Sequence, residues 1–328
     1  MTADTTRPAS ASPALCWLAF FTCVVIWGST FLVIRIGNSA VAPAWAAAIR
    51  LALAAIVLAA IARATGTPLP RGAALRAAAL YGFFNFGINF TLLYWGEVSF
   101  PSGLTAVLYA TIPLTTALIT AAIGLERLTM PRLIGALFAL GGVAVMMRER
   151  IGGDVTLGSF LAVFVAATSA GISVIFFKRG PKQSAIAANA VACVVGLVVC
   201  LAASFALREP HRAPPGWAGW LPIVYLTLLG SVVAFVSMSW LVHQWDVTRV
   251  AFIGVLVPIV ALGLGALVLG ERVPPASLLG TLLVLAGVVL AMRGAPSHAS
   301  APAPAPETGR SADPAARTAP IRRGDGAP

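Results

Sequence analysis

One arginine lies inside a long apolar stretch of this sequence. Arg50 is the only charged residue of a predicted helix over residues 42–62. A charge at the centre of a membrane helix costs about 2.5–3.5 kcal/mol on insertion scales, so the side chain should face a cavity, a carbonyl or an anion. Two interpretations follow for Arg50: a structural residue that ties helices together, or a contact with a substrate carboxylate or phosphate.

Uncharged polar residues recur in the other apolar stretches. Asn85 and Asn89 are four residues apart and therefore share one face of a helix. Gly82 and Gly96 fall on roughly the same face, which suits a cavity wall and equally suits hydrogen bonds that hold helices together. The further candidates for substrate contact are Trp27, Ser29, Thr30, Ser169, Ser237 and Trp240. For any serine or threonine, the alternative is a bond to a carbonyl of its own helix.

No aspartate, glutamate or histidine occupies the centre of a predicted span. Glu97 lies at the end of one span and is interpreted as interfacial or, alternatively, as part of a coupling site. His243 is interpreted as interfacial or, alternatively, as a gate or proton site. The four cysteines lie in apolar segments without a C-x-x-C spacing, and are typical of small buried hydrophobes. A membrane enzyme would need a nucleophile beside a base, or a metal cluster. The sequence therefore predicts no catalytic residue, no metal site and no cofactor.

The composition favours a membrane protein. Of 328 residues, 59% are hydrophobic and 10% charged, and the mean hydropathy is +0.91, whereas soluble domains are about 25% charged. Uncharged stretches of about 20 residues recur, the length that a helix needs to cross a bilayer. The net charge of +11 is explained by arginines in cytoplasmic loops. We therefore expect a lipid environment and no nucleic-acid partner.

The hydropathy pattern predicts an all-α polytopic membrane protein with ten transmembrane helices. The predicted spans are 15–36, 42–62, 75–96, 101–123, 131–147, 157–177, 184–207, 218–242, 248–269 and 276–292. The domains expected from this pattern are an N-terminal segment (1–14), a first five-helix repeat (15–147), a connecting loop (148–156), a second repeat (157–293) and an Ala/Pro-rich tail (294–328). The composition of the tail is typical of a disordered segment. The first span is expected to be retained as a helix and not removed as a signal peptide.

The two halves are duplicated. The segment from Gly103 to Arg148 aligns without a gap on the segment from Thr248 to Arg293, with a shift of 145 residues. The alignment places Pro113 on Pro258, Glu126 on Glu271, Gly135 on Gly280, and Gly142 on Gly287. Because five spans is an odd number, the second half should be inverted relative to the first. Inverted repeats place a substrate site near their shared axis, in a central cavity.

The distribution of lysine and arginine in short loops favours cytoplasmic N- and C-termini. Under that orientation Glu126 faces the cytoplasm and Glu271 faces outward. Pro113 and Pro258 should interrupt corresponding helices. Such matched kinks suit a pair of gates that open alternately, although inherited bends without a gating role are the alternative.

These motifs together resemble a known family. They are WGSTF at Trp27–Phe31, Pro43 followed by Arg50, YGFFNFGINF at Tyr81–Phe90, GLERL at Gly124–Leu128 and LGERV at Leu269–Val273. In this order, and doubled, they resemble the ten-helix EamA type of the drug/metabolite transporter superfamily, over residues 15–293. The resemblance implies a basket-like bundle that exports amino acids, other metabolites or drugs, usually driven by an ion gradient. The short four-helix members of that superfamily use a glutamate in the first helix, which this sequence lacks.

The sequence as a whole predicts a secondary transporter in the bacterial inner membrane. It would export a small metabolite, an amino acid or related compound, by alternating access. The alternatives are a drug or metabolite permease of the same fold that acts as a facilitator or importer, and a non-transporting membrane scaffold. A small-molecule substrate is therefore the expected partner, with a coupling ion as a further option, and the sequence predicts no particular oligomeric state.

Overall fold

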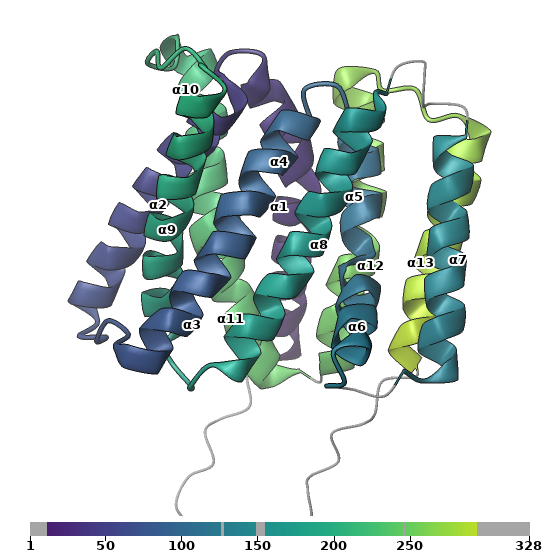
Figure 1. Cartoon of the computed structure of the whole chain (residues 1–328), viewed down its shortest axis with the longest axis horizontal. Coiled ribbons are helices and arrows are strands. Elements are labelled where there is room, and N and C mark those ends of the chain that lie inside the picture. Colours follow the sequence, from purple (N-terminus) through teal and green to yellow (C-terminus); the bar gives the residue numbers. More distant parts are fainter. Residues whose placement is uncertain (1–11, 126–127, 149–154, 246, 294–328) are drawn as a thin grey trace, which may run out of the picture. The chain divides into compact units, whose positions relative to one another are not determined.

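The structure is a computed structural model that describes residues 12–125, 128–148, 155–245 and 247–293. Most of the N-terminal segment, the loop centred on 149–154, Glu126 and the tail from 294 lie outside the described residues, as does the side chain of His243. The described part forms ten consecutive helical segments (Figure 1). Seven are single helices: α1 (Pro13–Asn38), α2 (Pro43–Ala64), α7 (Met130–Met147), α8 (Leu157–Arg179), α9 (Ala185–Ala206), α12 (Val247–Leu269) and α13 (Pro275–Arg293).

Three segments are composite. The third consists of α3 (Gly72–Gly82), the π-helix η1 (Phe83–Ile88) and α4 (Asn89–Gly96). The fourth consists of α5 (Ser102–Ala110) and α6 (Ile112–Ala122). The eighth consists of α10 (Gly216–Tyr225), the π-helix η2 (Leu226–Val233) and α11 (Ala234–Gln244). The ten predicted spans are thus all present, with ends that differ by a few residues.

Nine of the described segments are long and apolar enough to cross a membrane. The exception is the third segment, where Asn85 and Asn89 interrupt the apolar sequence. Two amides in a membrane helix need partners inside the protein. The segment that is least suited to lipid is therefore the one expected to carry functional polar groups.

Local sequence sets the helix ends. Proline occupies the first turn of α1, α2, α7 and α13, where its missing N–H costs nothing. The Ser12 hydroxyl also accepts a bond from the Leu15 amide (3.3 Å) at the start of α1. Gly124 and Gly270 follow the ends of α6 and α12 with positive φ (73° and 63°), a conformation that glycine adopts without steric cost.

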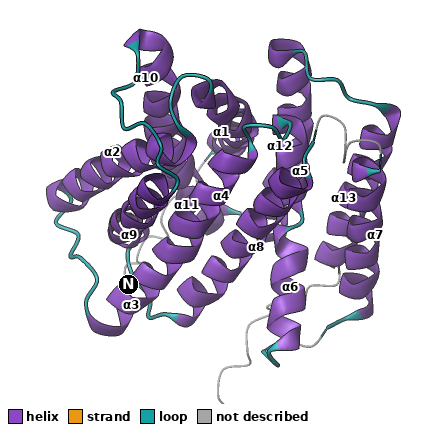
Figure 2. Cartoon of the chain, turned by 45° about the horizontal axis from the view of Figure 1, so that its top comes forward, coloured by secondary structure: helices purple, strands orange, loops and turns teal. Residues whose placement is uncertain are grey.

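The helix packing shows that the two halves are related by an approximate two-fold axis. Corresponding segments pack on each other: α2 on α9, α5 on α12, and α7 on α13 (Figures 1 and 2). The first helix of each half packs on the third segment of the other half: α1 packs on α11, and α8 packs on α3 and α4. The π-helices η1 and η2 also occupy corresponding places in the two composite segments.

The seam between α7 and α13 is built from glycines in a reciprocal arrangement. A Cβ at Gly135 would lie 2.5 Å from the Gly287 carbonyl oxygen, and a Cβ at Gly287 would lie 2.4 Å from that of Gly135. In the same way, a Cβ at Gly142 would lie 2.5 Å from the Gly280 carbonyl oxygen, and a Cβ at Gly280 would lie 2.5 Å from that of Gly142. Such contacts let two backbones pack closely in lipid, where small residues drive association. The duplicated glycine spacing is therefore structural.

Corresponding helices run in opposite directions. We call the face at which α1 begins the proximal face, and the face at which α1 ends the distal face. Glu271, just after α12, bonds to the backbone of Ser102 at the start of α5, so α12 ends where α5 begins. Helix α6, which continues the segment that α5 begins, runs from there toward the proximal face (Figure 1). The second half is therefore inverted, as the odd number of spans predicts.

The prediction of matched proline breaks is correct in one half only. Pro113 stands in the first turn of α6, and the helix is broken at Thr111 between α5 and α6. Pro258 lies inside α12, which continues through it. A proline ring collides with the carbonyl four residues earlier. That residue is Gly254 in the second half and Tyr109 in the first, and glycine gives the backbone more freedom to adjust.

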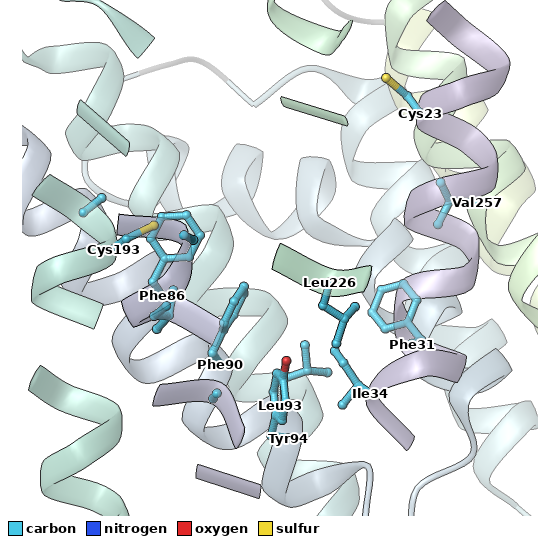
Figure 3. Close-up of a cluster of buried hydrophobic side chains, with 14 of the residues drawn as sticks. Cys23, Phe31, Ile34, Phe86, Phe90, Leu93, Tyr94, Cys193, Leu226 and Val257 are labelled. Carbon is cyan, nitrogen blue, oxygen red and sulfur yellow. The ribbon is translucent and has the colours of Figure 1, made fainter. Parts of the chain in front are cut away.

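Burial of apolar side chains forms the interior of the bundle. One cluster lies around α1, α2, α4 and α9, and includes Phe31, Phe86 and Phe90 (Figure 3). All four cysteines are free and buried, as predicted for small hydrophobes. Tyr94 extends the same column along α4 (Figure 3). This column brings an aromatic surface to the middle of the bundle.

We predict that Gly142→Ala lowers the thermal stability of the purified protein. The new methyl group would overlap the Gly280 carbonyl, and overpacking of this kind costs about 1–3 kcal/mol. The matched control is Gly141→Ala, because a Cβ at Gly141 meets nothing within 4 Å. Its melting temperature in detergent should be unchanged or higher, since alanine favours helix. Equal melting temperatures for the two variants would contradict the close packing of this seam.

Candidate functional site

Arg50 is buried in the middle of the bundle, with only 3% of its surface exposed. Its Nη1 donates to the Tyr94 hydroxyl (3.2 Å) and its Nη2 to the Ser231 hydroxyl (3.3 Å). The guanidinium carbon lies 4.6 Å from the centre of the Phe90 ring, in a cation–π contact. Its Nε has no partner, and no ion pair to Arg50 is found within the described chain.

Two elements place these partners around the guanidinium. Phe90 and Tyr94 are four residues apart in α4 and therefore lie on one face (Figure 3). The π-helix η2 supplies Ser231, whose hydroxyl donates to the Leu226 carbonyl five residues earlier (3.2 Å). Gly230, next to it, lets η2 approach, since a Cβ there would lie 3.3 Å from the Arg50 Nη2. A π-turn thus sits where the second half meets the arginine, which is typical of functional positions.

The electrostatics of this arrangement favour an anion. Burial removes the guanidinium from water, and hydroxyl groups and an aromatic face compensate only part of that loss. A carboxylate can accept two parallel bonds from one guanidinium. The free Nε and the weakly held Nη2 are therefore donors for a negatively charged group that enters this space.

Every tyrosine of the chain bonds to a residue that the sequence singles out. Tyr94 bonds to Arg50, as described above, and the others pair as follows. The Tyr225 hydroxyl lies 2.6 Å from the Ser29 hydroxyl, Asn85 Nδ2 donates to the Tyr81 hydroxyl (3.1 Å), and the Tyr109 hydroxyl donates to Asn89 Oδ1. The sequence contains four tyrosines in all. Their scarcity and their position inside apolar stretches are the signal that would have revealed them.

The two asparagines meet different helices. Asn85 Oδ1 accepts a bond from Ser173 on α8 (3.3 Å), whereas Asn89 bonds to Tyr109 on α5. The glycines expected on their face do not line a cavity. A Cβ at Gly82 would lie 2.5 Å from the backbone of α9, and one at Gly96 would lie 2.7 Å from a side chain of α8. Helix packing therefore explains these two glycines.

Other predicted residues make local contacts. The hydroxyls of Ser29 and Thr30 donate to carbonyls of their own helix, at 2.8 Å each. Ser169 differs, because its hydroxyl crosses to the Phe84 carbonyl in η1 (2.8 Å). Trp27 packs edge-on against Phe235, with ring centres 6.0 Å apart. The structure therefore connects these side chains to the helices around Arg50, without a direct bond to the guanidinium.

The remaining candidates lie on α11 and at the two prolines. Ser237 and Trp240 are half-buried, and Trp240 packs against the core cluster that contains Phe90. Pro113 is exposed and Pro258 is buried. None of these four residues contacts Arg50 in a described hydrogen bond or ring interaction.

A pocket of about 210 Å³ reaches the partner of Arg50 from the proximal half of the bundle. Its lining includes Leu58, Ser184, Asn189, Ser231, Phe235 and Val236. Ser231 connects this pocket to the arginine, because the same hydroxyl accepts the Arg50 bond. Asn189 donates to the Ala185 carbonyl (2.8 Å), but its Oδ1 has no partner. Most of the lining is apolar, so the pocket suits an apolar group that carries one polar end.

A second polar cluster joins the two halves at the distal face. Glu271 accepts bonds from the Ser102 amide and hydroxyl (2.9 Å each) and from the Gly103 amide (3.3 Å), at the start of α5. Arg35 Nε lies 3.5 Å from the Glu271 carboxylate, and its Nη1 donates to the Phe100 carbonyl (2.6 Å). We call Arg35, Ser102 and Glu271 the distal latch, because they join both halves of the chain.

Glu97 corrects the expectation of an interfacial side chain. It follows α4 directly, yet 0% of its surface is exposed. Neither of its carboxyl oxygens has a hydrogen-bond partner. Chain position at a helix end indicates contact with water, but the packing of α5 and the loop before it covers this residue. Sequence reasoning therefore missed the burial of Glu97 and the latch beside it.

Comparison with known proteins adds the family. The EamA-like transporter family matches residues 14–148 and, a second time, residues 157–293. The chain is 33% identical, over 82% of its length and 91% of the relative, to a "Probable terminal-alkyne amino-acid exporter" of Streptantibioticus cattleyicolor. It is 25% identical, over 83% of its length and 92% of the relative, to a "Probable amino-acid metabolite efflux pump" of Escherichia coli.

Further similarity supports the same assignment. An "Uncharacterized inner membrane transporter YedA" of Escherichia coli is 28% identical over 84% of this chain and 90% of the relative. One solved crystal structure superposes with a TM-score of 0.59 at 22% identity, covering 87% of this chain and all of the other, which shows the shared fold. The doubled match, the inverted helix pairing and these relatives agree, and this chain belongs to the EamA-like transporter family.

Proposed function

We propose that this transporter exports an amino acid or a closely related metabolite from the cytoplasm across the bacterial inner membrane. The observation that carries the proposal is Arg50, a buried guanidinium whose described partners are all neutral. The printed names of two relatives, an amino-acid exporter and an amino-acid metabolite efflux pump, support this substrate class. The relative named as an inner membrane transporter supports the location.

The residues around Arg50 match the parts of an amino acid. The Arg50 guanidinium binds the substrate carboxylate, and these bonds replace the weak bonds of the guanidinium to Ser231 and Tyr94. The unpartnered Oδ1 of Asn189, in the pocket that contains Ser231, accepts a bond from the ammonium group. Phe235 and Val236, in the same lining, contact an apolar side chain. The pocket thus offers a cation acceptor and an apolar surface, and the anion donor Arg50 lies next to it, bonded to the lining residue Ser231.

The two faces differ in a way that suits alternating access. The pocket beside Ser231 belongs to the proximal half, whereas Arg35 and Glu271 join the two halves at the distal face. If the proximal face is cytoplasmic, this conformation is the one that loads substrate from the cytoplasm. Export then requires the distal latch to open and the proximal half to close.

The break at Thr111 supports a role for Pro113 as a hinge in that exchange. At this break the Thr111 amide (3.1 Å) and hydroxyl (2.6 Å) both donate to the Leu108 carbonyl. Pro258 in the continuous α12 is the matching, less distorted position. We keep both prolines as gating residues in this proposal, with the larger movement at Pro113.

An alternative is a facilitator or importer for apolar metabolites or drugs. It is favoured by the lining of the proximal pocket, where six apolar residues, among them Leu58, Ile186 and Phe235, outnumber three polar ones. The two functions differ in their need for a substrate carboxylate, which Arg50 binds only in the first. A preference for carboxylate-bearing substrates therefore separates them.

We predict that Arg50→Gln abolishes the preference of the transporter for an amino acid over the corresponding amine. Glutamine keeps a donor toward Ser231 but removes the positive charge, so the carboxylate loses about 1.4 kcal/mol or more, which is tenfold in the flux ratio. The measurement is the flux of leucine and of isoamylamine in liposomes that contain purified protein. A ratio needs no correction for the amount of active protein.

The control for this experiment is Arg63→Ala, which removes an exposed arginine from the proximal end of the same helix. It should transport with the ratio of the natural protein. If Arg50→Gln also keeps that ratio, Arg50 does not bind a carboxylate. If no amino acid in a broad panel moves faster than through empty liposomes, the export proposal itself fails.

We predict that the proximal face is cytoplasmic. Ser39 lies in the exposed loop after α1, and Lys182 lies in the exposed loop before α9. A membrane-impermeant maleimide should label Ser39→Cys in intact cells, and should label Lys182→Cys only after the membrane is permeabilised. The four natural cysteines are buried, so their background is low. The opposite labelling pattern would reverse the direction of transport proposed above.

A further inference from the structure

A carboxylic acid that water cannot reach lies beside the distal latch. Glu97 is fully buried, and both of its oxygens lack a hydrogen-bond partner. The Thr105 hydroxyl next to it donates to the Pro101 carbonyl (3.2 Å), and its tendency to lower the pKa of Glu97 is smaller than the effect of burial, which raises it. An ionised carboxylate without hydrogen bonds is very unfavourable in such surroundings, because its hydration is lost without replacement. The neutral, protonated form is the one that fits this conformation.

The charged and titratable groups around Glu97 come from three other elements. Arg35 belongs to α1, Glu271 follows α12, and Tyr109 belongs to α5, while Tyr94 lies on the preceding helix α4. Arg35 attracts an ionised Glu97, but it is already bonded to Glu271 and to the Phe100 carbonyl. Burial, together with repulsion from the Glu271 carboxylate, holds the pKa of Glu97 well above its ordinary value.

We propose that Glu97 is a proton-binding site whose occupancy controls the distal latch. With the proton bound, Glu97 is neutral and Arg35 remains on Glu271, which keeps α5, α1 and the end of α12 together. When the proton leaves, two carboxylates compete for one guanidinium, and the closed arrangement is destabilised. Opening the latch admits water to Glu97, and this water solvates the ionised carboxylate.

The site selects a proton over a metal cation. The described residues contain no group of three or more His, Cys, Asp or Glu side chains that could hold a metal ion. Glu271 already accepts three hydrogen bonds at the start of α5. The Arg35 guanidinium would also repel a sodium ion placed between the two carboxylates. A proton needs only one carboxyl group and leaves no net charge.

The sign of the pH dependence follows from linkage. The pKa of Glu97 is raised in the closed state and is nearer its ordinary value once water enters. The proton therefore stabilises the closed latch fully below the ordinary carboxyl value, and this stabilisation is lost as pH rises through the raised value. Between these two values, one bound proton changes the ratio of closed to open molecules by about tenfold per pH unit. A more alkaline distal side favours opening.

Two spin labels, attached to Ser39→Cys and Leu269→Cys, can report the state of the latch directly. Ser39 and Leu269 line a groove of about 570 Å³ at the distal face, one at the end of α1 and the other at the end of α12. We expect the labelled protein to shift from a short to a long distance as pH rises from about 5 to about 9. Glu97→Gln, which imitates the protonated form, should keep the short distance at every pH.

The matched control is Glu209→Gln. Glu209 is another partly buried carboxylate of the distal face, but it is fully bonded, to the Ala44 and Trp45 amides and the Ser204 hydroxyl. Its replacement should leave the pH dependence of the label distance in place. If Glu97→Gln and the natural protein give the same pH profile, the proposal is wrong. A distance that responds to sodium at fixed pH, and not to pH, would also overturn it.

A measurement on the natural protein guards against a variant that does not fold. Difference infrared spectra should show the carbonyl stretch of a protonated carboxyl group that disappears as pH rises together with the change in label distance. Absence of that band at neutral pH would refute the proton site. The label distance does not depend on transport. Flux without a pH-dependent latch would therefore reject this inference alone, whereas a pH-dependent latch without flux would reject only the proposed export.

Discussion

The burial of the Arg50 guanidinium among neutral partners is the constraint on which the middle of the bundle depends. Lipid offers no hydrogen bonds, so the donors of this side chain depend on acceptors inside the protein. The solution draws on both halves, since Tyr94 comes from the first and Ser231 from the second. The π-helix that carries Ser231 and the glycine beside it exist where the second half must come close to the arginine.

The two edges of the molecule respond differently to movement. Glycines at the seam of α7 and α13 bring backbone onto backbone, and a contact of this kind leaves no side chain that could take a second position. The distal latch includes two long polar side chains, Arg35 and Glu271, whose bonds can be exchanged for water. Rearrangement is therefore expected at the latch and around Thr111, while the glycine seam stays fixed.

Much of this fold could be predicted from the sequence, because hydropathy reports helix length and a constant shift reports duplication. The ten spans, the inversion and the close glycine packing all follow from such patterns. The π-helices could not be predicted, since Phe83–Ile88 has the composition of any membrane helix. Nor could the burial of Glu97, because chain position gives no information about the loop that covers it. Site residues emerged only in part: Arg50 was evident from its charge, but the tyrosines that bond to the predicted residues were not.

The choice of a phenol as a neighbour of Arg50 has a consequence for turnover. A hydroxyl group both accepts and donates, unlike a carbonyl or a carboxylate. Tyr94 now accepts from the guanidinium. In the proposed export cycle, a substrate carboxylate would take over that role, and the Tyr94 hydroxyl could then turn its hydrogen toward the carboxylate and become a second ligand. Binding and release of the substrate would then leave no buried polar atom of the protein or the substrate without a hydrogen-bond partner, and this keeps the energy barrier low for both steps.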